Sequence, residues 1–187
     1  ALARFDKLVD LGDFVGVDDA LGIEQVVAHL RAGGRHDLAF IGSDEANFSG
    51  RARHEAFRQL TGPDAAANRE LLGAFSEDWG YEAGLTVLGG LVRPQALVCA
   101  NDLIAIGALR AAEQLGLSVP DDIAISGYDD IDMARVCKPA LTTVRQPVAA
   151  LSRRAVDLLL ARIDEPGRDA TRVLLETTLV VRDSTAP

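Results

Sequence analysis

Apolar and polar residues alternate along this chain with two different periods. Short apolar runs predict strands at 14–17, 38–41, 71–75, 96–100, 123–127 and 142–144, and a longer β-prone segment lies at 172–181. Stretches with apolar residues three and four positions apart predict helices over 23–30, 49–60, 76–88, 103–115 and 148–163. The succession of strands and helices predicts an α/β fold, in which a mostly parallel sheet is flanked by helices on both faces.

Residues that favour helix starts and turns mark the ends of several elements. Ser49 is expected to cap the helix that runs to Leu60, because a serine oxygen can accept from a free backbone N–H of the first turn. Ser76 or Asp78 is expected to start the next helix. The polar, alanine-rich stretch 64–70 predicts a loop.

The most informative polar residues follow two strands of the predicted sheet. Asn101 and Asp102 come directly after the strand at 96–100, and Asp129 follows the strand at 123–127. Ligands of open parallel sheets bind just past the carboxyl ends of the strands. The pattern therefore predicts a pocket at this edge for a ligand that carries hydroxyl groups or charge.

Asn101 and Asp102 have a second interpretation, as the N-cap of the helix that follows them. Asn and Asp are both favoured at that position, and the spacing alone gives the two interpretations equal weight. Both hold if Asp102 caps the helix while Asn101 turns its amide into the crevice. An amide there can donate to and accept from a hydroxyl or carbonyl group.

Asp129, Asp130 and Asp132 form an acidic cluster with two interpretations. Carboxylates are ligands for hard divalent cations, so a metal site is one of them. The other is a single ligand-binding aspartate with its neighbours in turns or in solvent. The cluster lacks the spaced ligands of an EF-hand loop, which favours the second interpretation and predicts no metal site.

Arg51, Arg53 and Trp79 are further candidates for contact with a ligand. A guanidinium can grip a carboxylate, a phosphate or two adjacent hydroxyls, although most arginines are solvated. Residues two positions apart face different ways on a helix, so at most one of Arg51 and Arg53 is expected to face a crevice. An indole usually packs in a core, but the ring of Trp79 could also stack on a sugar.

Composition and charge narrow the class of protein. The 187 residues carry a net charge of -9, so the chain is a poor candidate for binding nucleic acid by itself. No apolar run approaches the roughly 20 residues that span a bilayer, and the first residues lack a secretory apolar segment. Cys99 and Cys137 lack metal-like spacing. Cys99 is expected to be buried and reduced, which favours a cytoplasmic location.

Signatures of the common nucleotide-binding and hydrolytic sites are missing from the sequence. The serines have no G-x-S-x-G context, and there is no P-loop and no G-x-G-x-x-G. A catalytic triad or a nucleotide-binding fold is therefore not indicated, and no cofactor is expected.

Independent motifs follow one another from about Phe14 to Thr185. The most specific are Gly127-Tyr128-Asp129-Asp130 and Pro139-Ala140-Leu141-Thr142-Thr143-Val144. The others are Val17-Asp18-Asp19, Phe40-Ile41-Gly42, Ser49-Gly50-Arg51-Ala52-Arg53, Ala100-Asn101-Asp102, Leu115-Gly116-Leu117 and the closing Arg182-Asp183-Ser184-Thr185. In this order they resemble the effector-binding domain of lactose-repressor (LacI) type transcriptional regulators. Ala56 and Ser152 depart from that pattern, which usually has glycine there.

The resemblance implies a periplasmic-binding-protein-like α/β fold whose two lobes close on a small ligand. By position, Arg53, Asn101 and Asp129 match residues that contact the effector in that family. Trp79 matches an aromatic that packs on the bound sugar or base, and Ser49 matches a polar position near the same pocket. The resemblance implies a sugar-like effector first, and a purine or nucleoside second.

The resemblance also implies how the chain is divided. Residues 14–145 would form mostly the C-terminal lobe of the effector-binding domain, 146–165 the returning helix of the N-terminal lobe, and 170–185 a terminal strand segment. The helix-turn-helix DNA-binding domain and most of the N-terminal lobe are expected to lie outside this chain. The intact protein is expected to be a homodimer that reaches operator DNA only through that domain.

The expected function is effector sensing for a transcriptional regulator, and not catalysis. The alternative is a periplasmic-type solute-binding protein, which shares the fold; a helix-turn-helix or a signal peptide encoded upstream would distinguish the two. A magnesium-dependent phosphotransfer or hydrolase domain built on the acidic cluster is a third class. Tight magnesium binding that is lost in Asp129→Asn would support it.

Overall fold

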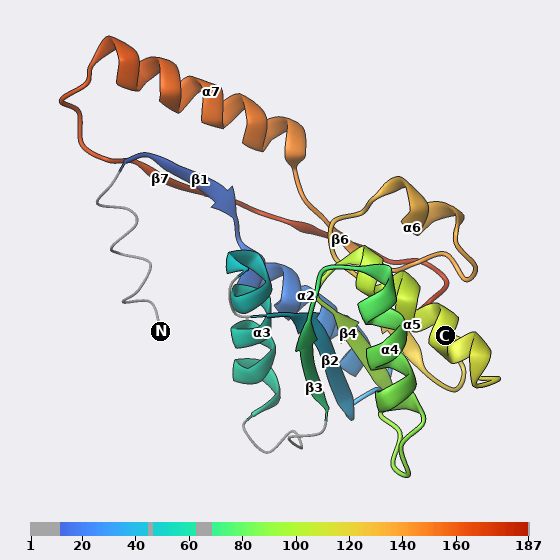
Figure 1. Cartoon of the computed structure of the whole chain (residues 1–187). Coiled ribbons are helices and arrows are strands. Elements are labelled where there is room, and N and C mark those ends of the chain that lie inside the picture. Colours follow the sequence, from blue (N-terminus) through green and yellow to red (C-terminus); the bar gives the residue numbers. More distant parts are fainter. Residues whose placement is uncertain (1–11, 45–46, 63–68, 187) are drawn as a thin grey trace. The chain divides into compact units, whose positions relative to one another are not determined.

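The computed structural model describes residues 12–44, 47–62 and 69–186, and its chain divides into two compact units (Figure 1). Unit 1 comprises Ala1–Asp18 and Gln146–Thr177, and unit 2 comprises Asp19–Arg145 and Thr178–Pro187. The chain therefore passes between the units three times. The assignment of such units to the lobes of a larger domain stays a prediction.

A four-stranded parallel sheet forms the centre of unit 2. Its strands lie in the order β3-β2-β4-β5 and have the bounds β2 Leu38–Ser43, β3 Glu70–Gly73, β4 Ala96–Cys99 and β5 Ala124–Ser126. All three pairings are parallel, with Phe40 opposite Val98 and Val98 opposite Ser126. The strands β2, β4 and β5 are buried throughout, because helices cover both faces.

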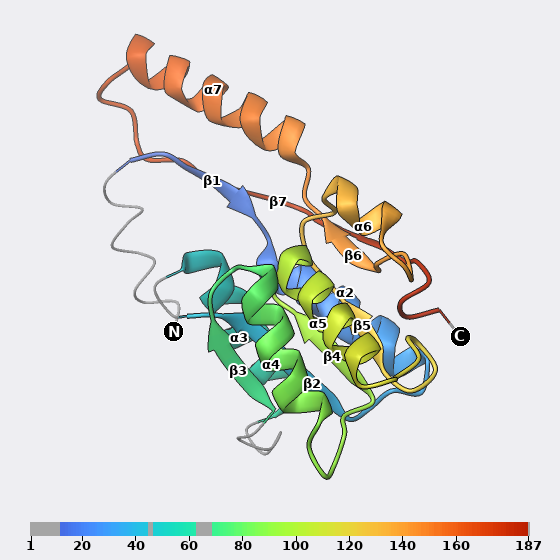
Figure 2. The ribbon, with the colours of Figure 1, turned by 45° about the vertical axis from the view of Figure 1, so that its right-hand side comes forward.

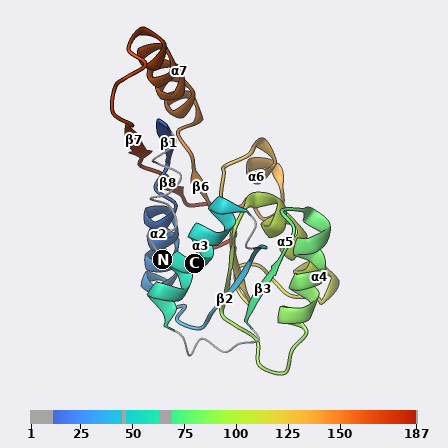
Figure 3. The same cartoon turned by 60° about the vertical axis from the view of Figure 1, so that its left-hand side comes forward.

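Four helices cover this sheet, two on each face (Figure 3). The pair α2 (Asp19–Ala32) and α3 (Phe48–Thr61) packs on one face, and the pair α4 (Glu77–Leu88) and α5 (Asp102–Gln114) packs on the other. This arrangement confirms the predicted α/β fold with a parallel sheet flanked on both faces.

The hydrophobic core of the described chain lies in unit 2. The fully buried large side chains come from both helix layers and from the strands: Phe40, Ile41, Phe57, Leu88, Leu97, Ile104, Ile125 and Tyr128 are among them. Cys99 is also fully buried and free, as expected, and burial raises the pKa of its thiol. The core rigidifies the strands whose carboxyl ends carry the candidate site.

Small elements complete unit 2 beyond β5. A one-turn helix, α6 (Asp132–Val136), was not predicted, because five residues are too short for a helical period to show. The strand β6 (Thr143–Arg145) pairs antiparallel with β8 (Thr178–Val180). The predicted single segment at 172–181 is therefore split, since its first half lies in unit 1 and its second half in unit 2.

Within the residues that the structure describes, unit 1 contains two strands and a long helix (Figures 1 and 2). The strands β1 (Phe14–Val17) and β7 (Arg172–Leu175) pair in parallel, and the helix α7 runs over Val148–Asp164. Leu158 is the one buried residue of α7, while Leu159 and Ile163 are about three-fifths exposed at 59% and 63%.

Several element limits differ slightly from the predictions. The strand β2 continues through Gly42 to Ser43, and Glu70 is already part of β3. Most of the predicted loop at 64–70 lies outside the described residues. Among the helices that the structure describes, none combines the length and the apolar character that a bilayer crossing requires.

Candidate functional site

The candidate site lies where the strand order of unit 2 reverses. The chain passes from β2 to β3 on one side of the sheet and from β4 to β5 on the other, so β2 and β4 are neighbours whose connections diverge. Parallel sheets bind ligands at such a switch point, beyond the carboxyl ends of the strands. Here those ends lead to Ser43, Asn101 and Asp129.

Arg53 is buried at this edge of the sheet, with 3% of its surface exposed. Its Nε donates to Oδ1 of Asp19 at 2.7 Å, and its Nη1 donates to the carbonyl of Ala100 at 2.7 Å. The guanidinium carbon also lies 3.6 Å from the centroid of the Tyr128 ring. Several partners therefore fix the fork of Arg53, whereas the guanidinium carbon of Arg51 lies 5.9 Å from the centroid of the Phe48 ring.

Asp129 is the partner of Arg53 at the end of β5. Its Oδ1 lies 3.4 Å from Nη1 of Arg53, and its side chain is 30% exposed. Its φ is 115°, a conformation that residues with a side chain rarely adopt, and Asp130 follows with a φ of 56°. Backbone strain of this kind persists where the surrounding structure holds it, and it is common in ligand sites.

Asn101 caps α5, and Asp102 does not. The Asn101 side-chain oxygen accepts from the backbone N–H of Ile104 at 2.9 Å, which is the N-cap interaction. The prediction that Asp102 would cap the helix is wrong, because Asn101 already has the extended backbone that a cap needs. In the part of the chain that the structure describes, the Asn101 amide nitrogen has no recorded protein partner.

Asp102 lies fully buried behind the site. Its Oδ1 accepts from the Thr143 hydroxyl at 2.5 Å, and its Oδ2 accepts from the Ile131 N–H at 2.8 Å. Burial raises the pKa of Asp102 to about 7, and the nearby carboxylates of Asp129 and Asp130 add to the rise, although the two hydrogen bonds oppose it. The residue connects α5 to β6 and to the loop that follows Asp129.

The acidic side chains at 129–132 form ion pairs with different arginines. Asp130 is bound by Arg145 and Arg182, and Asp132 is exposed and paired with Arg135. Burial alone would raise the pKa of Asp130, but the hydrogen bonds and charges of the two arginines outweigh it and hold that pKa below its usual range. Within the described residues, no three acidic, histidine or cysteine side chains are grouped so that they could hold a metal ion.

Ser49 lies inside α3, one residue after its start. Asn47 is the N-cap, since its side chain accepts from the backbone N–H of Gly50 at 3.0 Å. The prediction of Ser49 as the cap is therefore wrong. Asn and Ser are similarly favoured as caps, so residue type alone does not distinguish Ser49 from Asn47, which the prediction did not consider.

Trp79 lies in the first turn of α4, whose N-cap is Ser76, one of the two starts that the sequence predicted. Its indole N–H donates to the carbonyl of Gly42 at 2.9 Å, and its ring lies so close over β3 that a Cβ on Gly73 would come within 2.5 Å of it. The ring is thus held beside the carboxyl ends of β2 and β3. Whether it stacks on a ligand stays a prediction.

The sequence did not single out two residues that the structure brings to this edge. Asp19, the first residue of α2, is the buried partner of Arg53, but 34 residues separate the two and no local motif joins them. Phe75 follows β3, and its ring would lie 3.2 Å from a Cβ on Gly50, so it packs at the start of α3. The sequence predicted a strand over 71–75, which placed Phe75 within the strand and not after its carboxyl end.

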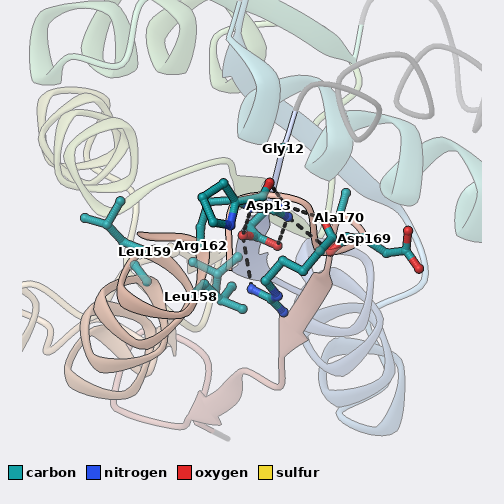
Figure 4. Close-up of a pocket in the computed structure, with 11 residues that line it drawn as sticks. Gly12, Asp13, Leu158, Leu159, Arg162, Asp169 and Ala170 are labelled. Atoms are coloured by element: carbon teal, nitrogen blue, oxygen red, sulfur yellow. Dashed lines mark hydrogen bonds and ion pairs between the residues drawn. The ribbon is translucent and has the colours of Figure 1, made fainter. Parts of the chain in front are cut away.

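A hollow of about 660 Å³ is lined by residues of unit 1 alone (Figure 4). Asp13 lies within it and accepts from Arg162 and Arg168 as well as from the N–H of Thr171. Arg162 also donates to the carbonyls of Pro166 and Asp169, so these polar groups hold the turn between α7 and β7 together.

The family comparison agrees with the fold. Residues 27–185 match the model of the periplasmic binding protein-like domain. The repressor PurR of Erwinia tasmaniensis is 37% identical over 156 residues, which are 82% of this chain and 46% of that protein. The chain spans about half the length of the curated relatives it matches.

Solved structures of transcriptional regulators share this fold. The regulator CelR in complex with cellobiose matches with a TM-score of 0.87 and 30% identity over 94% of this chain and 54% of that one. The lac repressor dimer bound to operator and the anti-inducer ONPF matches with a TM-score of 0.83 and 29% identity over 92% and 52%.

The fold is of the periplasmic-binding-protein type. The chain belongs to the family of periplasmic binding protein-like domains. The curated relatives that the chain matches are transcriptional repressors and regulators, and the solved structures that it resembles include regulators of the LacI type. The solute-binding protein considered above is not favoured, because the relatives are transcriptional repressors.

Proposed function

We propose that this chain binds a small polyhydroxyl effector, a sugar in the first place, at the carboxyl ends of β2, β4 and β5. The observation that supports the proposal best is the convergence of Arg53, Asn101 and Asp129, which come from three segments far apart in the sequence. A few polar groups of fixed orientation in a crevice are what a small-molecule site requires.

The three residues together offer both hydrogen-bond acceptors and hydrogen-bond donors. The partly exposed carboxylate of Asp129 can accept from one or two sugar hydroxyls. Arg53 can only donate, and its Nη2 has no recorded protein partner among the described residues, so it is available to a hydroxyl oxygen. The Asn101 amide nitrogen is a second donor, because its oxygen is already used as the helix cap.

Aromatic and small polar side chains complete the proposed site. Trp79 and Phe75 lie at the ends of β2 and β3, where an aromatic face can cover the apolar side of a sugar ring or a base. Ser49, in the first turn of α3, offers a hydroxyl that can donate or accept. A purine or nucleoside is the second ligand class, because it can use the same stacking surface.

The proposed role is the sensing of this effector for a DNA-binding regulator, without catalysis and without a cofactor. The ligand would bind two arrangements of the intact protein with different affinity and so shift the population that binds the operator. Contact with DNA would be made by a domain outside this chain. Homodimer formation and a cytoplasmic location belong to the same proposal, and the lac repressor is described as a dimer on its operator.

The experiment is a ligand screen followed by titration of variants of the full-length protein. Sugars and nucleobases are screened by thermal shift, since a ligand that binds the native state raises the apparent stability. The compound that gives the largest shift is then titrated by calorimetry. Asp129→Asn is expected to weaken its binding about tenfold or more, because a hydrogen bond to a charged group is lost. Arg53→Ala should weaken binding at least as much.

Asp132→Asn is the matched control, because Asp132 lies three residues away but is exposed and paired only with Arg135. It should bind the same compound as well as the wild type does. Equal affinity in the wild type, Arg53→Ala and Asp129→Asn would contradict the proposed site. A screen in which neither class of compound raises the melting temperature would contradict the proposed ligand.

A further inference from the structure

Three connections join the two units, and the unit 2 end of each is linked through side-chain contacts to the dipeptide Asp129–Asp130. The first connection enters at Asp19, the second leaves at Arg145, and the third enters at Thr178 and leads through β8 to Arg182. Side chains at each of these ends are joined by hydrogen bonds or ion pairs to the dipeptide Asp129–Asp130.

The first connection is joined to the dipeptide through Arg53. Asp19 begins α2, and its Oδ1 accepts from Nε of Arg53 at 2.7 Å. Nη1 of the same guanidinium lies 3.4 Å from Oδ1 of Asp129. Asp19, Arg53 and Asp129 all belong to unit 2, so these contacts fix the unit 2 end of the first connection.

The second and third connections are joined to the other residue of the dipeptide. Nε of Arg145 donates to Oδ2 of Asp130 at 2.5 Å, and Nη2 of Arg182 donates to Oδ1 of Asp130 at 2.5 Å. Arg182 also donates from Nη1 to the carbonyl of Leu141 at 2.7 Å. Each oxygen of Asp130 therefore binds an arginine from a different connection.

The dipeptide itself is fixed from the core side. The N–H of Asp129 donates to the carbonyl of Val144 at 2.8 Å, and the N–H of Asp130 lies 3.3 Å from the Thr143 hydroxyl. The buried carboxyl of Asp102 holds both that hydroxyl and the next N–H of the loop, that of Ile131. These contacts maintain two successive positive φ angles that the residues would not adopt alone.

We propose that Asp130 is a positioning residue that makes the effector-site loop a common anchor for all three connections. Asp129 would face the effector while Asp130, one residue away, holds the ends of the second and third connections. The regulatory meaning rests on the proposed function, because a ligand at Asp129 would then act on the same loop that fixes the connections. The anchoring itself is a property of the ligand-free chain and can be tested in it.

The burial of the partners predicts which connection depends most on Asp130. The side chain of Asp130 is 6% exposed and that of Arg182 is 12% exposed, whereas that of Arg145 is 55% exposed. Exposed ion pairs contribute little, since solvent screens them, and loss of a buried partner leaves an unpaired charge. The third connection should therefore respond more strongly than the second.

The test is amide hydrogen exchange of the ligand-free, full 187-residue chain, followed over residues 19–26, 143–147 and 178–182 and over the core strand 96–99. In Asp130→Asn, exchange at 178–182 is expected to become about tenfold faster, with a smaller increase at 143–147. Asp132→Asn is the control and should change none of the four segments.

Arg182→Gln is the second variant, in case Asp130→Asn does not fold. Arg182 has no recorded contact with Asp19 or Arg145, so a purely local contact would loosen 178–182 alone. A common anchor predicts faster exchange at 143–147 and 19–26 as well, while 96–99 keeps its wild-type rate.

Two outcomes would overturn the anchor. One is an effect of Arg182→Gln that stays within 178–182, and the other is faster exchange of equal size in all four segments, which indicates general destabilisation. Because no ligand is used, a negative effector titration would contradict only the proposed function. A negative exchange result would contradict only the anchor.

Discussion

The interior of unit 2 and the interior of unit 1 are stabilised by different interactions. Unit 2 buries a continuous apolar core between a parallel sheet and two helix layers. Unit 1 buries one residue of its long helix, and its strands β1 and β7 have no fully buried position. In unit 1, Asp13 before β1 instead forms ion pairs with Arg162 of α7 and with Arg168 of the turn that follows α7.

This difference teaches where precise positioning is possible. Close packing leaves little freedom to the strand ends of unit 2, so that Arg53, Asn101 and Asp129 can be held at fixed distances. An exposed apolar helix face, such as that formed by Val156, Leu159, Leu160 and Ile163 in unit 1, gives no such constraint. The candidate site accordingly lies in the unit with the core.

The largest contrast should come from truncation of apolar side chains. Phe57 is fully buried and packs on Phe40, with ring centroids 5.2 Å apart. Phe57→Ala should lower the free energy of unfolding of unit 2 by about 3–5 kcal/mol. Leu159→Ala, at a position 59% exposed in unit 1, should change it by less than about 0.5 kcal/mol.

Urea unfolding followed by tryptophan fluorescence can measure this contrast, because Trp79 is the one tryptophan and lies in unit 2. Equal losses in the two variants would show that the core of unit 2 is not the main source of its stability.

The second largest contrast should be in pH dependence. The pKa of Asp102 is raised to about 7 by burial, so its contribution to the stability of unit 2 is full below about pH 4. That contribution is lost as the pH rises to 7, and the change should be on the order of 3 kcal/mol. Asp102→Asn should remove this slope, which urea unfolding at a series of pH values can measure.

Unit 1 should respond to pH in the opposite direction. Hydrogen bonds from Arg162 and the Thr171 N–H hold the pKa of Asp13 below its usual value. The stability from Asp13 is therefore present above about pH 4 and is lost as the pH falls. The amide protection factors of α7, which are corrected for the intrinsic pH dependence of exchange, should fall on acidification in the wild type and fall less in Asp13→Asn; the reverse order would contradict the polar-cluster account of unit 1.

A third contrast concerns the space around glycines. A Cβ on Gly107 would come within 2.1 Å of the Glu77 carbonyl oxygen, because α4 and α5 touch there backbone to backbone. Gly107→Ala should destabilise unit 2 by about 1–3 kcal/mol or more. A Cβ on Gly167, in the unit 1 turn after α7, meets nothing within 4 Å, so Gly167→Ala should be neutral or slightly stabilising. Thermal melts of the two variants make the comparison.

The smallest contrast concerns helix caps. Ser76 caps α4 by accepting from the N–H of Trp79 at 3.1 Å, whereas α7 begins after Pro147 with no side-chain cap. Ser76→Ala should cost about 1 kcal/mol in urea unfolding. Val148→Ala, at the exposed first position of α7, should fall within about 0.5 kcal/mol. A cost for Ser76→Ala no larger than that of Val148→Ala would show that the cap contributes little.

Much of the fold could be predicted because local pattern and tertiary structure agree in unit 2. The apolar run at 96–100 became the buried strand β4, and Ser76 capped α4 as expected. The errors occurred where two local solutions were equally good. Asn47 and Ser49 could both cap α3, and Asn101 and Asp102 could both cap α5, so only the backbone path decided between them.

The sequence by itself determined the α/β class, the order of the strands and helices that form the central sheet and its two helix layers, and the candidate residues at the strand ends, because these depend on local periodicity and on short motifs. Only the tertiary structure decided that the segment at 172–181 is shared between two units, that Asp19 is the partner of Arg53, and that Asp130 joins Arg145 to Arg182. Those pairs are separated by 15 to 52 residues. Contacts at such separation arise from the way the strands pair and the helices pack, and no local pattern encodes them.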